Sequence, residues 1–243
     1  MAETVNRESR RPGESPAGQE SSSRPPPKSR VFIVDDHTMV REGLRQLIEY
    51  DPALTVCGDA ADAQMAMEGI RRSNPDVVIV DITLANSSGL DLVKHIRSEQ
   101  EDLPVLVVSM HDESLYAERA LRAGAMGYVM KNEPAKTVTA AIHSVLVGEM
   151  YLSRKMSSTV LSRFMRGETQ EPMSPLETLS DRELEVFRML GQGKGTRQIA
   201  QDLDLSIPTI QSFRNRIKEK LRLKTGPELV LHAIHWVQRE STK

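Results

Sequence analysis

The sequence predicts an α/β domain with a doubly wound parallel sheet, followed by a small all-α domain. Short runs rich in β-branched residues alternate with amphipathic stretches between residues 31 and 153, and no such run follows Thr178. The chain has 243 residues, enough for two domains because one core usually takes about 100–200 residues. We expect a tail at 1–29, the α/β domain at 30–153, a linker at 154–177 and the all-α domain at 178–243.

The first 29 residues contain almost no large apolar side chains, and they are rich in Pro, Ser, Arg, Glu and Gly. Such a segment buries too little apolar surface to offset the entropy lost on ordering. We therefore expect a disordered tail. A proline-rich docking segment is the less favoured alternative, because no repeated pattern supports it.

Five apolar runs are expected to form the strands of the sheet. They are 31–34 (VFIV), 55–57 (TVC), 77–80 (VVIV), 105–108 (VLVV) and 127–130 (GYVM). Continuous apolar runs are typical of parallel strands that are buried on both faces and joined by right-handed helical crossovers. Helices are expected at 39–49, 89–97 and 135–147, and the last begins after Pro134 and ends at Gly148.

Beyond the sheet, the sequence predicts a linker and then helices only. Within 154–177 we expect a short helix near Val160–Met165, because Pro172 and Pro175 interrupt the chain after it. The all-α domain is expected to contain four helices joined by short turns. These are Asp181–Leu190, Thr196–Leu203, Pro208–Leu221 and Pro227–Gln238.

Composition excludes several classes of protein. Hydrophobic residues make up 39% and charged residues 27%, as in an ordinary soluble protein. The single cysteine, Cys57, excludes an intrachain disulfide and a zinc site made of several cysteines. The longest apolar runs are far shorter than the ~20 residues that span a bilayer, and the N-terminal residues lack an apolar signal segment. We expect a cytoplasmic protein with no membrane partner.

The net charge of −2 conceals two opposite charges. Residues 31–153 carry 10 basic and 19 acidic side chains, a net charge of −9, whereas residues 178–243 carry 12 and 8, a net charge of +4. A basic domain beside an acidic one suggests a nucleic-acid partner for the basic one. The opposite charges also lead to the hypothesis that the two domains dock on each other in an autoinhibited state.

Polar side chains follow the strands at one edge of the predicted sheet. Asp35 and Asp36 follow the first strand, and Asp81 follows the third. The carboxyl ends of parallel strands meet at one crevice, where these carboxylates would repel unless a hard cation such as Mg²⁺ neutralised them. Ser109 and Lys131 follow two further strands. A hydroxyl and an ammonium beside such a cluster suit a phosphoryl group.

This set resembles the receiver domain of two-component response regulators, which has a flavodoxin-like fold, over residues 31–153. The resemblance implies that Asp81 is the phosphoacceptor and that Ser109 and Lys131 take part in its chemistry. It also implies Mg²⁺ bound by Asp35, Asp36, Asp81 and the backbone carbonyl of Thr83, and a switch formed by Ser109 and Tyr128. Such a chain catalyses only its own phosphorylation and dephosphorylation, so we expect no other enzymatic activity.

The loop after Asp81 departs from the family pattern. Ala85 stands where the family often has proline, although Gly89 keeps its expected place. Thr83 and His111 are similar to the two variable positions of receivers that influence the lifetime of the phosphoryl group. His111 is a candidate for positioning a hydrolytic water, with a simply solvated histidine as the more common alternative.

The segment from Thr196 to Leu221 has the pattern of a helix-turn-helix. Ser206 is a good N-cap, and Pro208 lies in the first turn of the second helix, where its missing N–H is tolerated. The second helix of such a motif enters the DNA major groove. The stretches LSDRELEVFRML, TRQIAQDLDLSIPTI and IKEKLRLK resemble the LuxR-type domain of NarL/FixJ response regulators. A basic, merely solvated helix is the less favoured alternative.

By the register of that motif, Gln211, Ser212 and Asn215 are expected to reach base edges, because Gln and Asn can pair bidentately with adenine. Five basic residues are expected to contact DNA phosphates. They are Arg197, Arg214, Arg216, Lys218 and Lys220. Two residues depart from the family pattern. Phe213 replaces a histidine common in the family, and Pro208 lies unusually near the recognition surface. These departures bear on individual base contacts and not on the class of domain.

The predicted function is that of a DNA-binding transcriptional regulator controlled by phosphorylation. By resemblance, a histidine kinase phosphorylates Asp81, the last helix forms a homodimer contact in the active state, and the target is double-stranded promoter DNA. Trp236, on that helix, is either an interface anchor or a core residue. One alternative is a regulator that acts without phosphorylation and uses the α/β domain as an interaction platform. Another is a Mg²⁺-dependent phosphohydrolase, but Thr83 stands where its second acid is needed.

Overall fold

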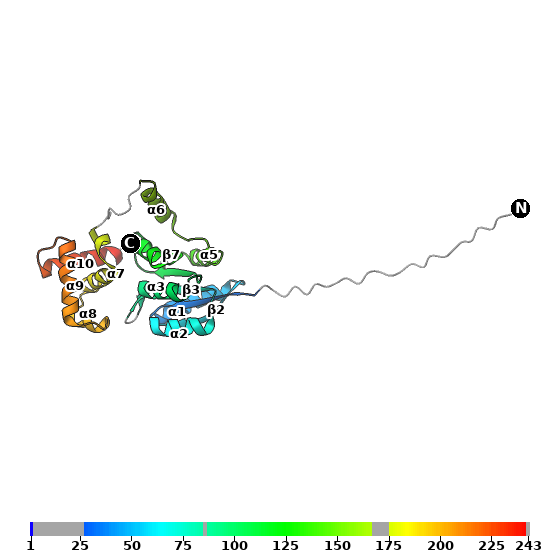
Figure 1. Ribbon diagram of the computed structural model, residues 1–243, viewed down its shortest axis with the longest axis horizontal. Coiled ribbons are helices and arrows are strands. Elements are labelled where there is room, and N and C mark those ends of the chain that lie inside the picture. Colours follow the sequence, from blue (N-terminus) through cyan, green and yellow to red (C-terminus); the bar gives the residue numbers. More distant parts are fainter. Residues whose placement is uncertain (2–26, 85–86, 167–174, 242–243) are drawn as a thin grey trace.

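The computed structural model describes Met1 and residues 27–84, 87–166 and 175–241 (Figure 1). The predicted disordered tail therefore lies outside the described residues, except for Met1 and its last three positions. Ala85 and Pro172 also lie outside them. No helix of the described part is long and apolar enough to cross a membrane.

A five-stranded parallel sheet forms the centre of the first body. Its strands are β1 (Ser29–Val34), β2 (Leu54–Ala60), β3 (Val77–Val80), β6 (Val105–Ser109) and β7 (Gly127–Met130), in the order β2-β1-β3-β6-β7. All four pairings are parallel. Strand β2 lies on one side of β1, and the chain then crosses to β3 on the other side of β1. This reversal creates the switch point at which ligands bind in doubly wound folds.

The second strand is longer than the predicted run 55–57. Residues 58–60 also pair with β1, opposite Phe32, Ile33 and Val34. Gly58 and the exposed Asp59 interrupt the apolar pattern of this edge strand, so periodicity alone could not reveal the additional residues.

Helices cover both faces of the sheet. The helices are α1 (Thr38–Tyr50), α2 (Ala63–Ser73), α3 (Gly89–Glu99), α4 (Glu113–Ala123) and α5 (Ala135–Leu146). Buried residues of α1 and α5 pack with Ile33, Ile79 and Val108, whereas those of α2, α3 and α4 pack with Val34 and Val80 on the opposite face. Two of these helices, α2 and α4, were not predicted individually, although Asp62 and Asp112 accept backbone hydrogen bonds as their N-caps.

A two-stranded hairpin follows the third strand. It pairs β4 (Thr83–Leu84) with β5 (Ser87–Ser88) and leads directly into α3. Gly89 passes so close to the third strand that a Cβ atom on it would lie 1.8 Å from the backbone oxygen of Asp81. Only glycine fits there, because the atoms that an added Cβ would meet belong to the backbone of Asp81 and Ile82.

The segment between the two bodies is more helical than predicted. Helix α6 (Arg154–Arg166) begins well before the expected Val160–Met165, and a 3-10 turn, η1 (Pro175–Thr178), begins the second body. Helix α6 lies against α4 and buries Met156. The polar residues around Met156 conceal this buried position in the sequence.

The second body, residues 175–241, contains the four predicted helices, and no end differs from its predicted position by more than three residues. They are α7 (Asp181–Gly191), α8 (Thr196–Asp202), α9 (Ile207–Lys220) and α10 (Gly226–Ser241). Phe187, Ile199, Ile217 and Ala233 lie in its core. The Ser206 hydroxyl accepts a hydrogen bond from the Thr209 N–H, which confirms the predicted cap of α9.

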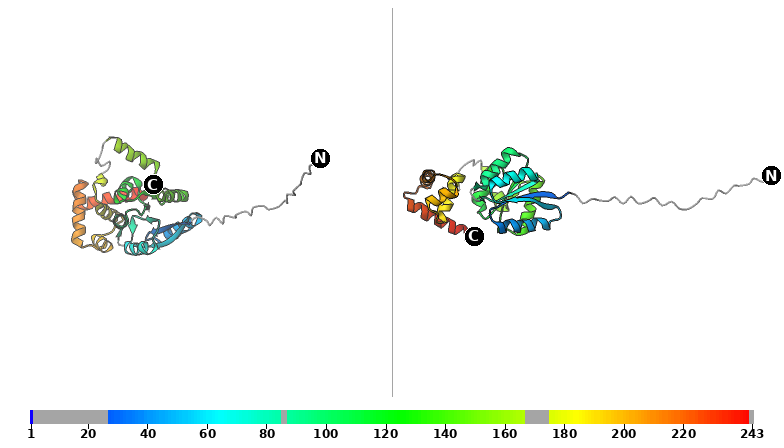
Figure 2. Two further views of the ribbon diagram at one scale, coloured as in Figure 1. Left: turned by 45° about the vertical axis from the view of Figure 1, so that its right-hand side comes forward. Right: turned by 90° about the horizontal axis from the view of Figure 1, so that it is seen from below.

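The two bodies, called the α/β body (residues 29–146) and the helical body (residues 175–241), lie side by side. In Figure 1 and the left view of Figure 2, α7 lies between the sheet and α9. The second helix of the helix-turn-helix is thus on the side of the helical body that faces away from the sheet.

We predict that Gly89→Ala destabilises the protein by about 1–3 kcal/mol or more, because the added methyl group meets backbone atoms that must shift. Urea denaturation followed by circular dichroism measures the change. Gly43→Ala is the control, since nothing lies within 4 Å of its added Cβ and alanine favours a helix interior. Equal stability of the two variants would contradict the close approach of Gly89.

Candidate functional site

The predicted carboxylates converge at the carboxyl edge of the sheet. Asp35 follows β1 and is 1% exposed, and Asp81 follows β3 and is 4% exposed. Asp35, Asp36, His37 and Asp81 each offer a possible ligand atom, and these atoms lie within 4.8 Å of one another. His37 was not predicted as part of the site. Its Nδ1 lies 2.7 Å from Oδ1 of Asp36, and only its position next to the two acids signals this in the sequence.

Lys131 reaches this cluster from the end of β7. Its Nζ lies 2.7 Å from Oδ2 of Asp81 and 2.5 Å from Oδ2 of Asp35. Burial alone would lower the pKa of Lys131, but the attraction and hydrogen bonds of the two carboxylates outweigh it and raise the pKa. The ammonium is therefore charged at neutral pH. The structure confirms that these three residues lie together.

One carboxylate oxygen of the cluster suits a cation. Among the described residues, Oδ1 of Asp81 is buried and has no hydrogen-bond partner. Burying a carboxylate oxygen without a partner is costly. A set of carboxylate oxygens is what Mg²⁺ prefers. The residues of this site therefore fit a hard divalent cation.

Ser109 and Tyr128 are both buried, and Ser109 lines the same pocket as Asp81 and Lys131. Ser109 ends β6, and the His111 N–H lies 3.5 Å from its hydroxyl. The Tyr128 hydroxyl donates a hydrogen bond to the His111 backbone oxygen at 2.8 Å. Tyr128 thus points inward, into the body and not toward solvent.

His111 is buried, so the alternative of a solvated histidine is wrong. It is 3% exposed, and its ring stacks on Tyr116 at 4.5 Å between centroids. Burial lowers its pKa well below 6.5, and the positive charges of Arg188 and Lys131 lower it further. The imidazole is neutral at pH 7. Sequence reasoning could not place Tyr116 or Arg188 beside it.

Thr83 links the site to the helical body. Its hydroxyl lies 2.9 Å from Nε2 of His111 and accepts a hydrogen bond from Nη1 of Arg188, on α7, also at 2.9 Å. The role of the Thr83 backbone carbonyl as a metal ligand stays a prediction.

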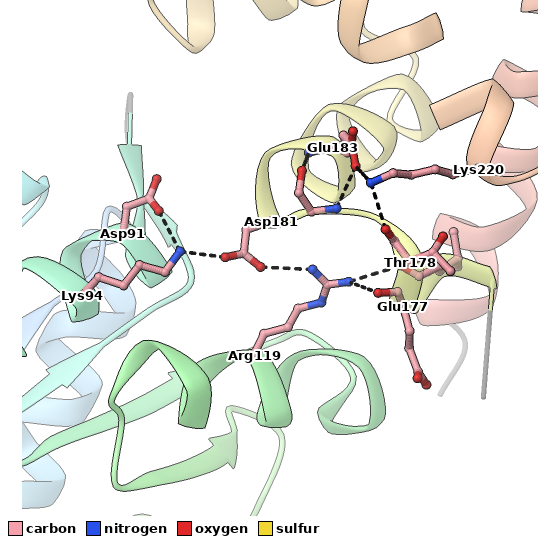
Figure 3. A network of polar contacts seen from close by, with 10 residues as sticks. Asp91, Lys94, Arg119, Glu177, Thr178, Asp181, Glu183 and Lys220 are labelled. Atoms are coloured by element: carbon pink, nitrogen blue, oxygen red, sulfur yellow. Dashed lines mark hydrogen bonds and ion pairs between the residues drawn. The ribbon is translucent and has the colours of Figure 1, made fainter. Parts of the chain in front are cut away.

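Ion pairs hold the helical body against α3 and α4 (Figure 3). Asp181 lies in the first turn of α7. Its Oδ2 is 2.9 Å from Nζ of Lys94, and its Oδ1 is 3.0 Å from Nη1 of Arg119. Arg119 also donates hydrogen bonds to the backbone oxygens of Leu176 and Glu177. Burial would raise the pKa of Asp181, but the two cations outweigh it and lower the pKa. Here the acidic body supplies the cations, which the net charges did not suggest.

A cavity of about 950 Å³ lies between the two bodies. Asp81, Ser109 and Lys131 line it from the α/β body, and Glu185 and Arg188 line it from α7. Burial, together with repulsion from Asp91, raises the pKa of Glu185. The helical body therefore forms one wall of the pocket that contains Asp81.

The predicted base-reading residues are accessible while the two bodies are in contact. Gln211, Ser212 and Asn215 are exposed on α9. They lie close together on one helix face, because residues three and four apart are neighbours there.

The predicted phosphate contacts differ in their surroundings. Arg197 is exposed and Lys218 is partly exposed. Arg214 donates a hydrogen bond to the Thr196 hydroxyl at 2.8 Å, and the Arg216 guanidinium lies 4.7 Å from the centre of the Phe213 ring. These contacts hold parts of the helical body together, and the roles in DNA binding stay predictions.

Lys220 forms the closest ion pair of this body. Its Nζ lies 2.6 Å from the buried carboxylate of Glu183, which also accepts a hydrogen bond from the Ser180 N–H in a capping box. Trp236 packs against Phe187, with ring centres 5.5 Å apart. Trp236 is partly buried and packs against the core of this body, which favours the second of its two predicted roles, whereas a role at an interface stays a prediction.

Comparison with known families identifies both bodies. Residues 31–143 match the response regulator receiver domain, and residues 177–233 match the bacterial regulatory proteins of the luxR family. The oxygen regulatory protein NreC of Staphylococcus carnosus (strain TM300) is 32% identical over 209 residues, which cover 84% of this chain and 96% of that protein. NreC of Staphylococcus epidermidis is 33% identical over 210 residues, with the same coverage.

Solved structures agree with this result. A LuxR-family response regulator from Aurantimonas sp. SI85-9A1 is 36% identical, with a TM-score of 0.53, and covers 57% of this chain and 99% of that one. RcsB of Salmonella enterica serovar Typhimurium, bound to promoter rprA with phosphomimetic BeF3-, is 23% identical. Its TM-score is 0.62, with 85% of this chain and 98% of that one covered, and this likeness concerns the fold alone. The chain belongs to the two-component response regulators of the NarL/FixJ type, in which a receiver domain precedes a LuxR-type helix-turn-helix domain.

Proposed function

We propose that this response regulator binds promoter DNA under the control of phosphorylation at Asp81. The convergence of Asp35, Asp36, Asp81 and Lys131 carries the proposal. A phosphoacceptor needs a carboxylate beside positive charge, and Asp81 lines a pocket that Lys131 also lines.

In the proposed reaction, a carboxylate oxygen of Asp81 attacks the phosphorus atom of a phosphohistidine on the partner kinase. The oxygen–phosphorus bond forms as the phosphorus–nitrogen bond breaks, and the imidazole leaves. Lys131 holds the carboxylate in place and keeps its positive charge near the transferred group. The Ser109 hydroxyl lies at the end of the adjacent strand and would donate a hydrogen bond to a phosphoryl oxygen.

Asp35, Asp36, Asp81 and the backbone carbonyl of Thr83 would hold Mg²⁺. When bound, Mg²⁺ supplies positive charge that offsets the charge of the carboxylates and of the phosphoryl group. Apart from forming and losing its own phosphoryl group, the chain is proposed to have no enzymatic activity.

Phosphorylation is proposed to bias a two-state surface. The new charge would draw Ser109 and Lys131 toward the phosphoryl group, and Tyr128 would follow, because its hydroxyl bonds to the loop that begins at Ser109. The proposed result is a homodimer, formed in part through α10, that reads paired half-sites in promoter DNA.

The helical body supports the proposed contacts with DNA. Gln211, Ser212 and Asn215 would reach base edges, and Arg197 and Lys218 would contact phosphates. Arg214, Arg216 and Lys220 have internal partners, so their phosphate contacts would have to be made by the remaining donor groups. We place the domain boundaries at 30–153 and 178–243, after a tail at 1–29 and with a linker at 154–177. The proposed location of this function is the cytoplasm.

We predict that Asp81→Asn takes up no phosphoryl group from acetyl phosphate and Mg²⁺, because the amide is a far poorer nucleophile than the carboxylate. Gel electrophoresis that retards phosphoproteins measures the uptake. Asp76→Asn is the matched control, since Asp76 lies exposed before β3, at the far end of the same strand. Undiminished labelling of Asp81→Asn would count against the proposal.

We predict that Asn215→Ala weakens binding to duplexes selected by the protein from a random pool by roughly 5- to 150-fold, the cost of losing a bidentate base contact. Its binding to scrambled duplexes should change little. Fluorescence anisotropy measures both affinities.

Arg197→Gln is the contrasting variant. It should weaken both kinds of duplex alike and reduce the slope of log affinity against log salt by about 1, the effect of losing one phosphate contact. If Asn215→Ala behaved in the same way, the proposed division into base and phosphate contacts would be wrong.

A further inference from the structure

Arg188 brings a positive charge of the helical body into the phosphorylation pocket. It lies on α7, and its Nη1 is 2.9 Å from the hydroxyl of Thr83, two residues after Asp81. Arg188 lines the same cavity as Asp81 and Lys131. Its charge also acts on the buried ring of His111. The position of the guanidinium relative to this pocket is therefore defined by a specific contact.

The direction of the hydrogen bond between Arg188 and Thr83 follows from the chemistry of the groups. A guanidinium has donors and no acceptor, so the Thr83 hydroxyl oxygen accepts from Arg188. The same hydroxyl lies 2.9 Å from Nε2 of His111. Arg188 is thus joined through Thr83 to His111, and all three line the pocket that contains Asp81.

Arg188 differs from the other charged residues that line the pocket from the helical body. Asp181 pairs with Lys94 and Arg119, Glu185 pairs with Arg182, and Lys194 pairs with Asp202. Among the described residues, no carboxylate lies within ion-pair distance of Arg188, whose hydrogen-bond partner is a neutral hydroxyl. Its charge is available to an anion that enters the pocket.

The charge balance of the pocket indicates which anion this is. With Mg²⁺ bound, the formal charges of Asp35, Asp36, Asp81, Lys131 and the ion sum to zero. Phosphorylation replaces the single negative charge of the Asp81 carboxylate by a phosphoryl group of about −1.5 to −2. The phosphorylated pocket therefore has up to about one uncompensated negative charge. Arg188 would restore neutrality.

We propose that Arg188 is a phosphoryl-binding residue of the receiver pocket, supplied by the DNA-binding domain. The proposal rests on the proposed function of Asp81 as phosphoacceptor. The planar guanidinium pairs with two oxygens of a phosphoryl group, a geometry that suits arginine better than lysine.

This role has a consequence for signalling. Because coupling between two binding events is reciprocal, a phosphoryl group that binds Arg188 strengthens the contact between α7 and the α/β body. Gln211, Ser212 and Asn215 are exposed while that contact is present. The phosphorylated chain can therefore keep its two bodies together and still present its base-reading residues.

The test uses the full chain and beryllofluoride with Mg²⁺, a mimic of the phosphoryl group, titrated by calorimetry. We expect Arg188→Gln to weaken binding by about tenfold or more, as for loss of a hydrogen bond between charged groups. Arg188→Lys keeps the charge without the fork geometry and should give an intermediate affinity. Thermal unfolding followed by circular dichroism verifies that each variant is folded.

Arg182→Gln is the matched control. Arg182 is also on α7 and pairs across the same interface with Asp91, its Nη2 lying 3.0 Å from Oδ2 of Asp91. The side chain of Arg182 is 38% exposed. Its loss removes a contact between the bodies. Arg182 does not itself line the pocket, although its second partner, Glu185, does. The affinity should therefore stay within about twofold, as for other exposed ion pairs.

Three outcomes would overturn the role of Arg188. They are an unchanged affinity in Arg188→Gln and Arg188→Lys, tighter binding in either variant, or equal weakening in Arg188→Gln and Arg182→Gln. A failure of the proposed function itself looks different, because then the wild-type chain would not bind beryllofluoride, or Asp81→Asn would bind it equally well.

Discussion

The structure depends on the burial of carboxylates at the carboxyl edge of a parallel sheet. Asp35 and Asp81 end adjacent strands and are almost fully buried, so their mutual repulsion is little screened by water. Lys131, from the end of β7, compensates part of this charge. The strand order β1-β3-β6-β7 brings Asp35, Asp81, Ser109 and Lys131 to consecutive strand ends. The remaining imbalance makes the edge a site for a cation and a phosphoryl group.

The contact between the two bodies follows local geometry and not net charge. Residues 31–153 carry a net charge of −9, yet Lys94 and Arg119 of the α/β body hold Asp181 of the helical body. The opposite arrangement, Arg182 with Asp91, is found at the same interface. The opposite net charges of the two domains predicted their contact, but they do not explain which residues form it. An ion pair depends on the few charges nearby, because salt screens charges beyond one Debye length of ~10 Å.

The helical body uses part of its positive charge internally. Lys220 compensates the buried Glu183, which also caps α7, and Arg214 joins α9 to α8 through Thr196. A run of basic residues in a DNA-binding domain thus includes residues that hold its helices together. Spacing in the sequence does not distinguish them from residues proposed to face DNA, because basic residues of both kinds lie within the same stretch of α9.

The sequence alone determined the strand order along the chain, most of the helices, and the identity of the residues at strand ends, since these depend on local periodicity and on the geometry of parallel sheets. The structure confirmed that Asp35, Asp36, Asp81 and Lys131 meet. Only the tertiary structure decided that His111 is buried against Tyr116, that Arg188 reaches Thr83, and that Lys220 pairs with Glu183. The reason is physical. These contacts join residues from separate elements, and their distances depend on how whole helices pack, which no local pattern encodes.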